Sequence, residues 1–419
     1  MSDIRPFKAF RPTPQLAAQV AALPYDVMTS DEARVMVEGN PHSFLHVDKS
    51  EISLDKSVGL YDDAVYAKAA ENLNNMISNG ILVQDDKPCF YIYRQIMDGR
   101  AQTGLVACCS VNEYLDGSIK KHELTREDKE RDRIRHVETC AAHTGPIFMA
   151  YRQKDAIDAV VDAWIAQNTP TYSFIAEDGI SHIVWAINDE ITIEQLRTLF
   201  IEVPALYIAD GHHRNASAVK AAQNIRTQNP NYDPNAEFNF YLSVLFPSNQ
   251  LYIMDYNRII KGLNGLTNEA FLAKVAERFT IEIQNDDSTT QNGFKPKERH
   301  TFGMYLNGNW YLLTAKPEFV NENDSIDSLD VSVLQNNLLA PILNITDPRT
   351  NKNIDFVGGG RGVLELKRRV DSGEMAVAFS LYPTSMNELF GVADDDKIMP
   401  PKSTWFEPKL RSGLFIHKF

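Results

Sequence analysis

One short turn brings together several side chains that can do chemistry. An apolar run from Val203 to Ala209 is followed directly by Asp-Gly-His-His-Arg, and a helical pattern of small residues begins after it. A strand that runs into a helix exposes free backbone N–H groups and the positive end of the helix dipole, where anions bind well. The sequence therefore predicts an anion site at this turn, with phosphate as the preferred ligand.

Each residue of the turn suits a different task in such a site. Gly211 lets the backbone approach a ligand closely, and Arg214 can bind two phosphate oxygens at once. His212 and His213 can donate hydrogen bonds or move protons near neutral pH. Asp210 can bind Mg²⁺ or a hydroxyl, or it can cap the helix. We interpret the turn as a phosphate cradle with proton-transfer groups attached.

Two other interpretations of the turn stay open. It can be a helix cap whose histidines lie at the surface, or it can be a metal site. Adjacent histidines on a turn point apart, and the sequence has no HExxH or HxH pattern that would support a metal. The phosphate interpretation is preferred because one turn seldom collects so many kinds of polar functional group without a use for them.

Further candidates lie near the N-terminal half of the chain. His122 and Glu123 stand just before a strongly charged helical pattern, so they can supply chemistry or simply begin the helix. Thr125 and Asp128 have the spacing of a capping box there. Asp26 lies in the stretch PYDV, which is also typical of a turn.

Two candidates lie nearer the C-terminus. The stretch GGGRG, with Arg361, resembles an anion loop but lacks the spacing of a P-loop, and a plain tight turn is the preferred interpretation. The stretch PPKSTWFEPK offers Lys402, Ser403 and Thr404 together, a trio that suits a phosphate or a carboxylate but also a solvated tail.

Composition restricts the class of protein. The 419 residues include 42 Lys and Arg and 56 Asp and Glu, so the formal charge is 42 − 56 = −14. An acidic chain repels nucleic acid and anionic membranes, so we expect neither as a partner. The first residues lack the apolar core of a signal peptide, and no apolar run is long enough to span a membrane. The four cysteines have no metal or disulfide spacing, which favours a cytoplasmic protein.

Strands and helices alternate from the N-terminus through the turn, which favours a mixed α/β fold. Thr29 and Glu32 predict a capped helix, 43–47 a buried strand, and 61–79 a helix. Two apolar stretches around Asp98-Gly99 predict a hairpin, and 145–151 predicts another buried strand.

The later part of the chain predicts further elements. Residues 237–246 and 251–260 resemble paired strands, and 266–279 begins a helix. A strand pair is expected around Met304 and 311–313, and 355–383 returns to strand, glycine loop, helix and strand.

We expect four segments along the chain. They are an N-terminal α/β region (1–200), a core segment that carries the turn (201–262), a smaller lobe (263–354), and a C-terminal α/β segment that returns to the core (355–419).

The chain resembles the bacterial and archaeal family called domain of unknown function 1015, or DUF1015. The matching stretches run nearly end to end and in the family's order: PFKAFRP, LPYDV, NPHSFLHV, KHELT with Asp132-Arg133, GPIFMAY, ADGHHR and MPPKSTWFEPKLRSGL. The turn itself resembles the phosphate-binding signature of the ParB/sulfiredoxin-like fold, in which a glycine-led turn with a terminal arginine holds nucleotide phosphates. The resemblance therefore implies a nucleotide-binding core of that fold, with additional α/β elements and a smaller C-terminal lobe.

The resemblance extends to archaeal free serine kinase, which carries a similar turn. It implies phosphoryl transfer between a donor, ATP or ADP with Mg²⁺, and free L-serine or phosphoserine. Asp210 would orient the acceptor or bind Mg²⁺. Glu123, with His122 beside it, is the first choice for general base, and Asp26 the second.

By the same resemblance the C-terminal trio from Lys402 to Thr404 would bind a carboxylate or phosphate of the substrate. A nucleotide-binding regulatory or sensing protein of the ParB type, without catalysis, is the alternative function.

Overall fold

The structure is a computed structural model that describes residues 2–284 and 292–419. The chain forms two compact units. The first contains Met1–Leu251 and Pro408–Phe419, and the second is Tyr252–Glu407. These boundaries differ from the four expected segments, since residues 355–407 group with the smaller lobe, while the last residues of the chain belong to the first unit.

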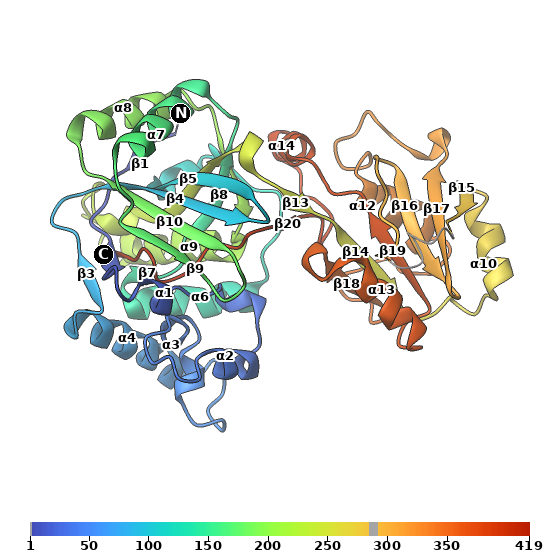
Figure 1. Ribbon diagram of the computed structural model, residues 1–419, viewed down its shortest axis with the longest axis horizontal. Helices are drawn as coiled ribbons and strands as arrows, with labels where there is room; N and C mark the ends of the chain where they lie inside the picture. Colours follow the sequence, from blue (N-terminus) through green and yellow to red (C-terminus); the bar gives the residue numbers. More distant parts are fainter. Residues whose placement is uncertain (1, 285–291) are drawn as a thin grey trace. The chain divides into compact units, whose positions relative to one another are not determined.

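A mixed nine-stranded sheet organises the first unit (Figure 1). Only two strand pairs in it, β11 with β6 and β12 with β8, are parallel. In spatial order the strands are β6 (Ile119–Lys120), β11 (Leu206–Asp210), β8 (Ile147–Tyr151), β12 (Phe240–Pro247), β5 (Arg100–Ser110), β4 (Phe90–Met97), β10 (Ser181–Ile187) and β9 (Tyr172–Ile175), with β1 (Ile4–Arg5) paired to β5. The predicted mixed α/β fold is confirmed.

The predicted hairpin joins β4 and β5. Met97 pairs with Arg100, and the turn residues Asp98 and Gly99 both have positive φ, 51° and 77°. Asp-Gly tolerates this conformation and matches the twist of the strands that it connects.

Helices cover the sheet and surround the turn. Figure 1 shows α7 (Asp155–Gln167) and α8 (Glu190–Ile201) together on one side, and α2 (Ser30–Met36), α3 (Leu45–Asp48) and α4 (Asp63–Ser78) as a group on the other. The remaining helices are α1 (Ala17–Val20), η1 (Tyr25–Val27), η2 (Ser50–Ser53), α5 (Val111–Leu115), α6 (Glu127–Cys140), α9 (His212–Gln228), η3 (Glu237–Asn239) and η4 (Ser248–Gln250). Two short ribbons, β2 (Phe10–Pro12) with β3 (Leu82–Gln84) and β7 (Ala142–His143) with β21 (His417–Lys418), complete the unit.

The main core of the first unit holds α9 against the sheet. Ala218 and Ala222 of α9 are buried in one cluster with Ile208 of β11 and Met149 of β8. Small side chains on α9 let the helix pack closely, which fixes its N-terminus at the end of β11.

The predicted strand at 43–47 is wrong. Leu45–Asp48 is a short helix, and Phe44, Leu45 and Val47 are buried against α4 in a separate cluster. A short apolar run is compatible with a buried helix as well as a buried strand, and periodicity alone cannot separate them.

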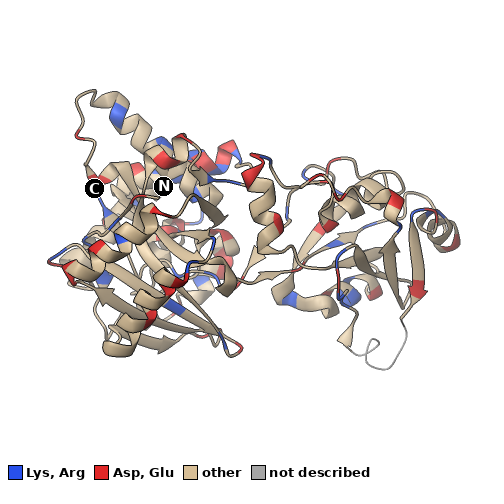
Figure 2. Cartoon of the chain, turned by 90° about the horizontal axis from the view of Figure 1, so that it is seen from above, with Lys and Arg blue, Asp and Glu red and all other residues tan. Residues whose placement is uncertain are grey.

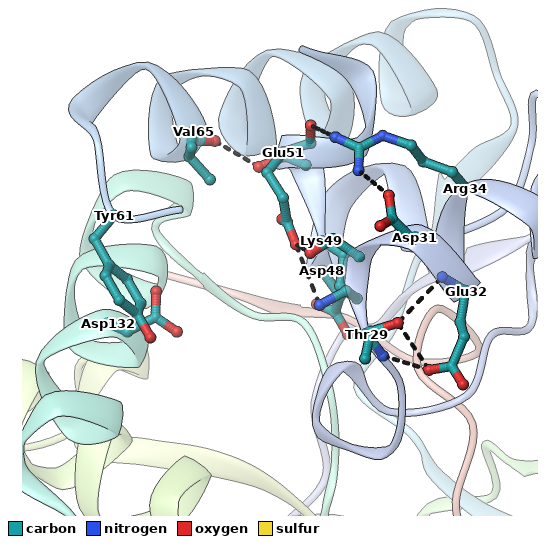
Figure 3. Close-up of polar contacts among 12 residues, drawn as sticks. Thr29, Asp31, Glu32, Arg34, Asp48, Lys49, Glu51, Tyr61, Val65 and Asp132 are labelled. Carbon is teal, nitrogen blue, oxygen red and sulfur yellow. Dashed lines mark hydrogen bonds and ion pairs between the residues drawn. The ribbon is translucent and has the colours of Figure 1, made fainter. Parts of the chain in front are cut away.

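One predicted capping box is confirmed and the other is wrong. Thr29 and Glu32 cap α2 reciprocally, as the dashed lines of Figure 3 show. Helix α6 instead begins at Glu127, after Arg126, which makes no side-chain cap bond. Thr125 stands one residue before this cap position, and its hydroxyl donates to Glu130.

The second unit is built on an antiparallel sheet. In spatial order its strands are β15 (Phe279–Ile283), β17 (Asn309–Ala315), β16 (Thr301–Leu306), β19 (Val377–Leu381), β14 (Tyr256–Ile260) and β18 (Ile354–Gly358). The other elements are β13 (Ile253–Met254) paired with β20 (Trp405–Phe406), and the helices α10 (Asn268–Val275), η5 (Pro317–Phe319), α12 (Asp330–Leu334), η6 (Gln335–Leu339), η7 (Gly359–Arg361), α13 (Gly362–Asp371) and α14 (Met386–Asp394).

Predictions for the second unit have mixed outcomes. The pair of β16 with β17 and the succession of β18, α13 and β19 are confirmed. The predicted pairing of 237–246 with 251–260 is wrong, because β12 belongs to the first sheet and β14 to the second. The chain passes from one unit to the other between these strands.

Two general properties bear on partners. Within the described residues no helix is long and apolar enough to cross a membrane. Figure 2 shows Lys and Arg interspersed with Asp and Glu along both units. The expected absence of a nucleic-acid partner stays a prediction.

Candidate functional site

The Asp-Gly-His-His-Arg turn joins the end of β11 to the start of α9. Gly211 occupies the cap position of α9 with φ 90° and ψ 31°, a left-handed conformation that favours glycine. Because glycine has no side chain, it cannot cap the first N–H groups of the helix, and the first turn of α9 contains no acidic residue. The positive end of a 17-residue helix is therefore left open to an external anion.

The Arg214 side chain folds back over this glycine. A Cβ atom at Gly211 would lie 3.2 Å from Cζ, Nε and Nη2 of Arg214. Arg214 Nη1 donates to the Pro146 carbonyl at 2.6 Å, while its Nε is buried and has no hydrogen-bond partner among the described residues. Burial lowers the pKa of Arg214, but the nearby charges of Asp26 and Asp210 outweigh it and raise the pKa. The guanidinium is fixed, charged and still has a donor to offer.

Asp210 is neutralised by a residue from the C-terminal segment. Its Oδ2 lies 2.9 Å from Lys409 Nζ, and its Oδ1 accepts the Gly211 N–H at 2.7 Å. Burial alone would raise the pKa of Asp210, but Lys409 and Arg214 lower it below its ordinary value. Sequence reasoning missed Lys409. It lies in the stretch PPKSTWFEPK, but no spacing rule connects it to the turn.

The residues present do not fit Mg²⁺ held by Asp210. Both carboxylate oxygens already accept hydrogen bonds, and the Lys409 ammonium would repel a cation. Over residues 2–284 and 292–419 no group of His, Cys, Asp and Glu side chains is arranged to hold a metal. No step of the chemistry below is assigned to a metal ion.

His122, Glu123 and His212 come together beside the turn. The two imidazole rings meet edge to face with centroids 4.5 Å apart, and His212 Nδ1 lies 3.6 Å from Glu123 Oε2. Burial lowers the pKa of His122 to about 4 and that of His212 well below its ordinary value, so both rings are neutral at physiological pH. The Glu123 side chain is 44% exposed. The structure thus pairs the proposed base with His212 as well as placing it next to His122.

His213 and Asp26 lie on another side of the turn. His213 Nε2 accepts the backbone N–H of Arg126 at 3.1 Å, which ties the turn to the start of α6. Burial lowers the pKa of His213, and the charge of Asp26 opposes this shift. Asp26, exposed in η1, also acts on the pKa of Arg214. Asp26 is therefore near the turn, and its role as the second candidate base stays a prediction.

A small cavity adjoins the turn and was not predicted. Its volume is about 30 Å³, and Arg214 lines it together with Asp48, Arg133 and Thr144. Arg133 and Arg214 lie in stretches that resemble the family, but nothing in the sequence indicates that they meet Asp48 and Thr144.

The predicted substrate trio lies in the second unit. Lys402 Nζ is 5.6 Å from the centroid of the Tyr256 ring, and Ser403 Oγ donates to the Pro400 carbonyl. The Ser403 carbonyl accepts from Thr384. These are local contacts, and the substrate-binding roles of Lys402, Ser403 and Thr404 stay predictions.

The glycine loop before α13 has a structural explanation. A Cβ atom at Gly358 would lie 2.9 Å from the Trp405 ring, and one at Gly359 would lie 2.7 Å from Met254 Cβ. Close packing of the ribbon β13–β20 therefore requires both glycines.

Comparison with known proteins identifies the family. The family model described as "Protein of unknown function (DUF1015)" matches residues 4–332. The chain belongs to the DUF1015 family. The predicted resemblance is thereby confirmed, whereas the ParB/sulfiredoxin-like fold name stays a prediction. No curated protein matches the chain.

Several solved structures are distantly similar to the chain. Free serine kinase in complex with AMP has a TM-score of 0.34 and 12% identity, over 72% of this chain and 86% of that one. A conserved hypothetical protein from Pyrococcus furiosus has a TM-score of 0.34 and 13% identity, over 74% and 93%. SbnI with a C-terminal truncation, from Staphylococcus aureus, has a TM-score of 0.36 and 9% identity, over 72% and 82%.

Proposed function

We propose that this DUF1015 protein is a small-molecule phosphotransferase that moves a phosphoryl group between a nucleotide and free L-serine or phosphoserine. The observation that carries the proposal is the open N-terminus of α9 with the Arg214 guanidinium packed over Gly211. Helix N–H groups and a fixed guanidinium are the groups that phosphate oxygens require. The serine acceptor rests on the resemblance of the turn to that of free serine kinase.

The charges around the turn suit an anionic donor, ATP or ADP. Lys409 neutralises Asp210, so this carboxylate does not cancel the positive charge of Arg214. The backbone N–H groups of His212, His213 and Arg214 form the N-terminal end of α9. The helix dipole makes this end positive. In this proposal they hold the phosphates of the donor, and transfer depends on positioning and charge stabilisation.

The proton of the acceptor hydroxyl is assigned to Glu123. The serine oxygen attacks phosphorus, the bond between phosphorus and the leaving phosphate oxygen breaks, and the hydroxyl proton passes to the Glu123 carboxylate. In this proposal the neutral His212 ring, whose Nδ1 lies 3.6 Å from Glu123 Oε2, helps to position this carboxylate. His122 packs against the His212 ring and fixes its position. Asp26 is the second choice for base.

The test measures nucleotide binding and turnover together. We expect Arg214→Ala to weaken the binding of AMP, ADP or ATP at least tenfold in calorimetric titration, and to abolish transfer to L-serine. Lys220→Ala, an exposed lysine on the same helix, is the matched control and leaves both unchanged. Normal affinity and turnover in Arg214→Ala would refute the cradle.

The same cradle serves the alternative function. A nucleotide-binding regulatory or sensing protein needs the open helix end and Arg214 but no base. Arg214-dependent nucleotide binding without transfer to any acceptor would favour this alternative.

A further inference from the structure

The cavity beside the turn adds Arg133 and Asp48 to the charged groups that bind phosphate in the proposed function. Arg133, from α6, lines it on one side and Arg214 on another. Its polar lining also includes Asp48 at the end of α3, His136 of α6, His143 of β7, Thr144 and Tyr25. The volume of about 30 Å³ exceeds the roughly 10–15 Å³ that one water needs. The cavity therefore has room for more than one polar group.

Arg133 is held rigidly with its charge directed to the cavity. Its Nε donates to Asp132 Oδ2 at 2.9 Å, and its Nη1 lies 3.3 Å from the Asp48 carbonyl. Its guanidinium stacks 4.2 Å from the centroid of the Tyr25 ring. Asp132 in turn accepts from the Tyr66 hydroxyl at 2.8 Å. These contacts remove the rotational freedom that would otherwise oppose ligand binding.

Hydrogen-bond acceptors line the same cavity. Asp48 is 4% exposed, and its Oδ1 accepts from Thr144 Oγ1 at 2.7 Å. His143 is buried, and its Nε2 has no hydrogen-bond partner among the described residues. The other side of this ring bonds to the Phe240 backbone, and burial lowers the pKa of His143 well below its ordinary value. Nε2 of the neutral ring is therefore a lone-pair acceptor.

An ion pair and a hydrogen bond fix segment 48–51. Lys49 Nζ pairs with Glu51 at 3.1 Å, and Arg34 of α2 donates to the Glu51 carbonyl (Figure 3). These contacts fix the backbone that follows Asp48.

Two guanidinium groups, one carboxylate and the imidazoles of His136 and His143 thus line one small space, and His136 Nε2 already lies 3.1 Å from Thr144 Oγ1. Among the described residues, Arg214 Nε is a buried donor and His143 Nε2 a buried acceptor without a hydrogen-bond partner. A ligand with an acceptor and a donor would supply both partners.

We infer that this cavity binds the α-carboxylate and α-ammonium groups of a free amino acid. The carboxylate lies between Arg133 and Arg214, and the ammonium group faces Asp48 and His143 Nε2. The inference rests on the proposed function for the identity of the amino acid, L-serine. It assigns Arg133 as a residue that determines specificity for an acceptor with a carboxylate, next to the phosphates held at the turn.

The experiment is calorimetric titration of the full chain with four separate ligands. L-Serine carries both charged groups, L-serinamide lacks the carboxylate, and 3-hydroxypropionate lacks the ammonium group. Inorganic phosphate reports a general anion site. We expect L-serine to bind at least tenfold more tightly than either analogue and more tightly than phosphate.

Conservative variants assign the two charged groups. Arg133→Lys keeps the charge next to Asp132 but loses the planar fork, so binding of L-serine and of 3-hydroxypropionate weakens at least tenfold. Asp48→Asn keeps an acceptor for Thr144 but removes the charge, so only ligands with an ammonium group weaken. Arg131→Lys, on the exposed side of the same helix, is the control. Unchanged circular dichroism and unchanged AMP affinity show that each variant is folded.

The outcomes separate this inference from the proposed function. If Arg133→Lys binds L-serine with wild-type affinity, the inference is overturned. Loss of L-serine binding in Lys402→Ala but not in Arg133→Lys would place the amino-acid site elsewhere and would overturn it too. Phosphate binding that depends on Arg133, with no binding of L-serine, also overturns it. Arg133-dependent binding of L-serine without phosphoryl transfer to it supports the cavity assignment and refutes the proposed function instead.

Discussion

The pair formed by Asp210 and Lys409 allows a quantitative test of how the turn is stabilised. The Lys409 side chain is 12% exposed and that of Asp210 30%, with 2.9 Å between Nζ and Oδ2. Lys409→Met leaves the Asp210 carboxylate with the Gly211 N–H and partial access to water. A hydrogen bond to a charged group contributes about 1.5–3 kcal/mol. Because Asp210 is partly exposed, we expect the free energy of unfolding to fall by about 2 kcal/mol.

A double-mutant cycle isolates this interaction. Asp210→Asn keeps an oxygen for the Gly211 N–H, so Asp210→Asn with Lys409→Met removes both charges and little else. We expect a coupling energy of about 1–2 kcal/mol by urea denaturation at pH 7. Because Lys409 and Arg214 lower the pKa of Asp210, this stabilisation is present above the unfolded pKa of about 4 and is lost as the pH falls below it. A coupling energy below about 0.3 kcal/mol at pH 7 would refute the reasoning.

Three further predictions follow from the geometry. Gly211→Ala should lower the free energy of unfolding by about 1–3 kcal/mol because of its positive φ, and further because the new Cβ displaces the Arg214 guanidinium. Gly117 has a φ of 84° and open space where a Cβ would lie, so Gly117→Ala should show only the loss caused by φ. Denaturation should show the larger loss at Gly211, and nucleotide binding should weaken only there; equal effects would contradict the packing of Arg214. Burial raises the pKa of Glu113 to about 7. The protonated carboxyl is therefore the form that suits the folded protein: the stability that depends on Glu113 is highest below the unfolded pKa and is lost as the pH rises through 7. Glu113→Gln should therefore stabilise the protein by about 1–3 kcal/mol at pH 8 and have little effect at pH 4; a pH-independent difference would be inconsistent with this. All four cysteines are buried, and burial raises the pKa of each thiol. A thiol-disulfide reagent should modify all of them rapidly in denaturant and none rapidly in the native protein, and rapid native labelling of any one would disprove its burial.

The sequence predicts the local geometry of the turn well because that geometry is encoded locally. An apolar strand, a glycine with positive φ and a run of small helical residues are consecutive in the chain, and β11, Gly211 and α9 follow that order. The hairpin at Asp98-Gly99 is predictable for the same reason. The short apolar run at 43–47 predicts a strand wrongly because its burial as a helix against α4 depends on distant residues.

Contacts between distant segments could not be predicted from spacing. Lys409 reaches Asp210 across 199 positions, and Arg133 meets the Asp48 backbone across 85. His212 Nδ1 comes within 3.6 Å of Glu123 Oε2 although 89 positions separate them, and β6 and β11, which lead to these residues, are neighbours in the sheet. Such contacts are set by the order of strands, which local patterns do not specify.

The most direct test of the central claim is ³¹P NMR of the purified protein with L-serine and, in turn, ATP, ADP and pyrophosphate, with and without Mg²⁺, together with the reverse mixture of AMP or ADP with phosphoserine. The account predicts a new phosphomonoester signal, or the consumption of phosphoserine, in the wild-type protein and in Lys220→Ala but not in Arg214→Ala. Phosphoryl transfer that persists in Arg214→Ala, or the absence of both transfer and nucleotide binding in the wild-type protein, would contradict it.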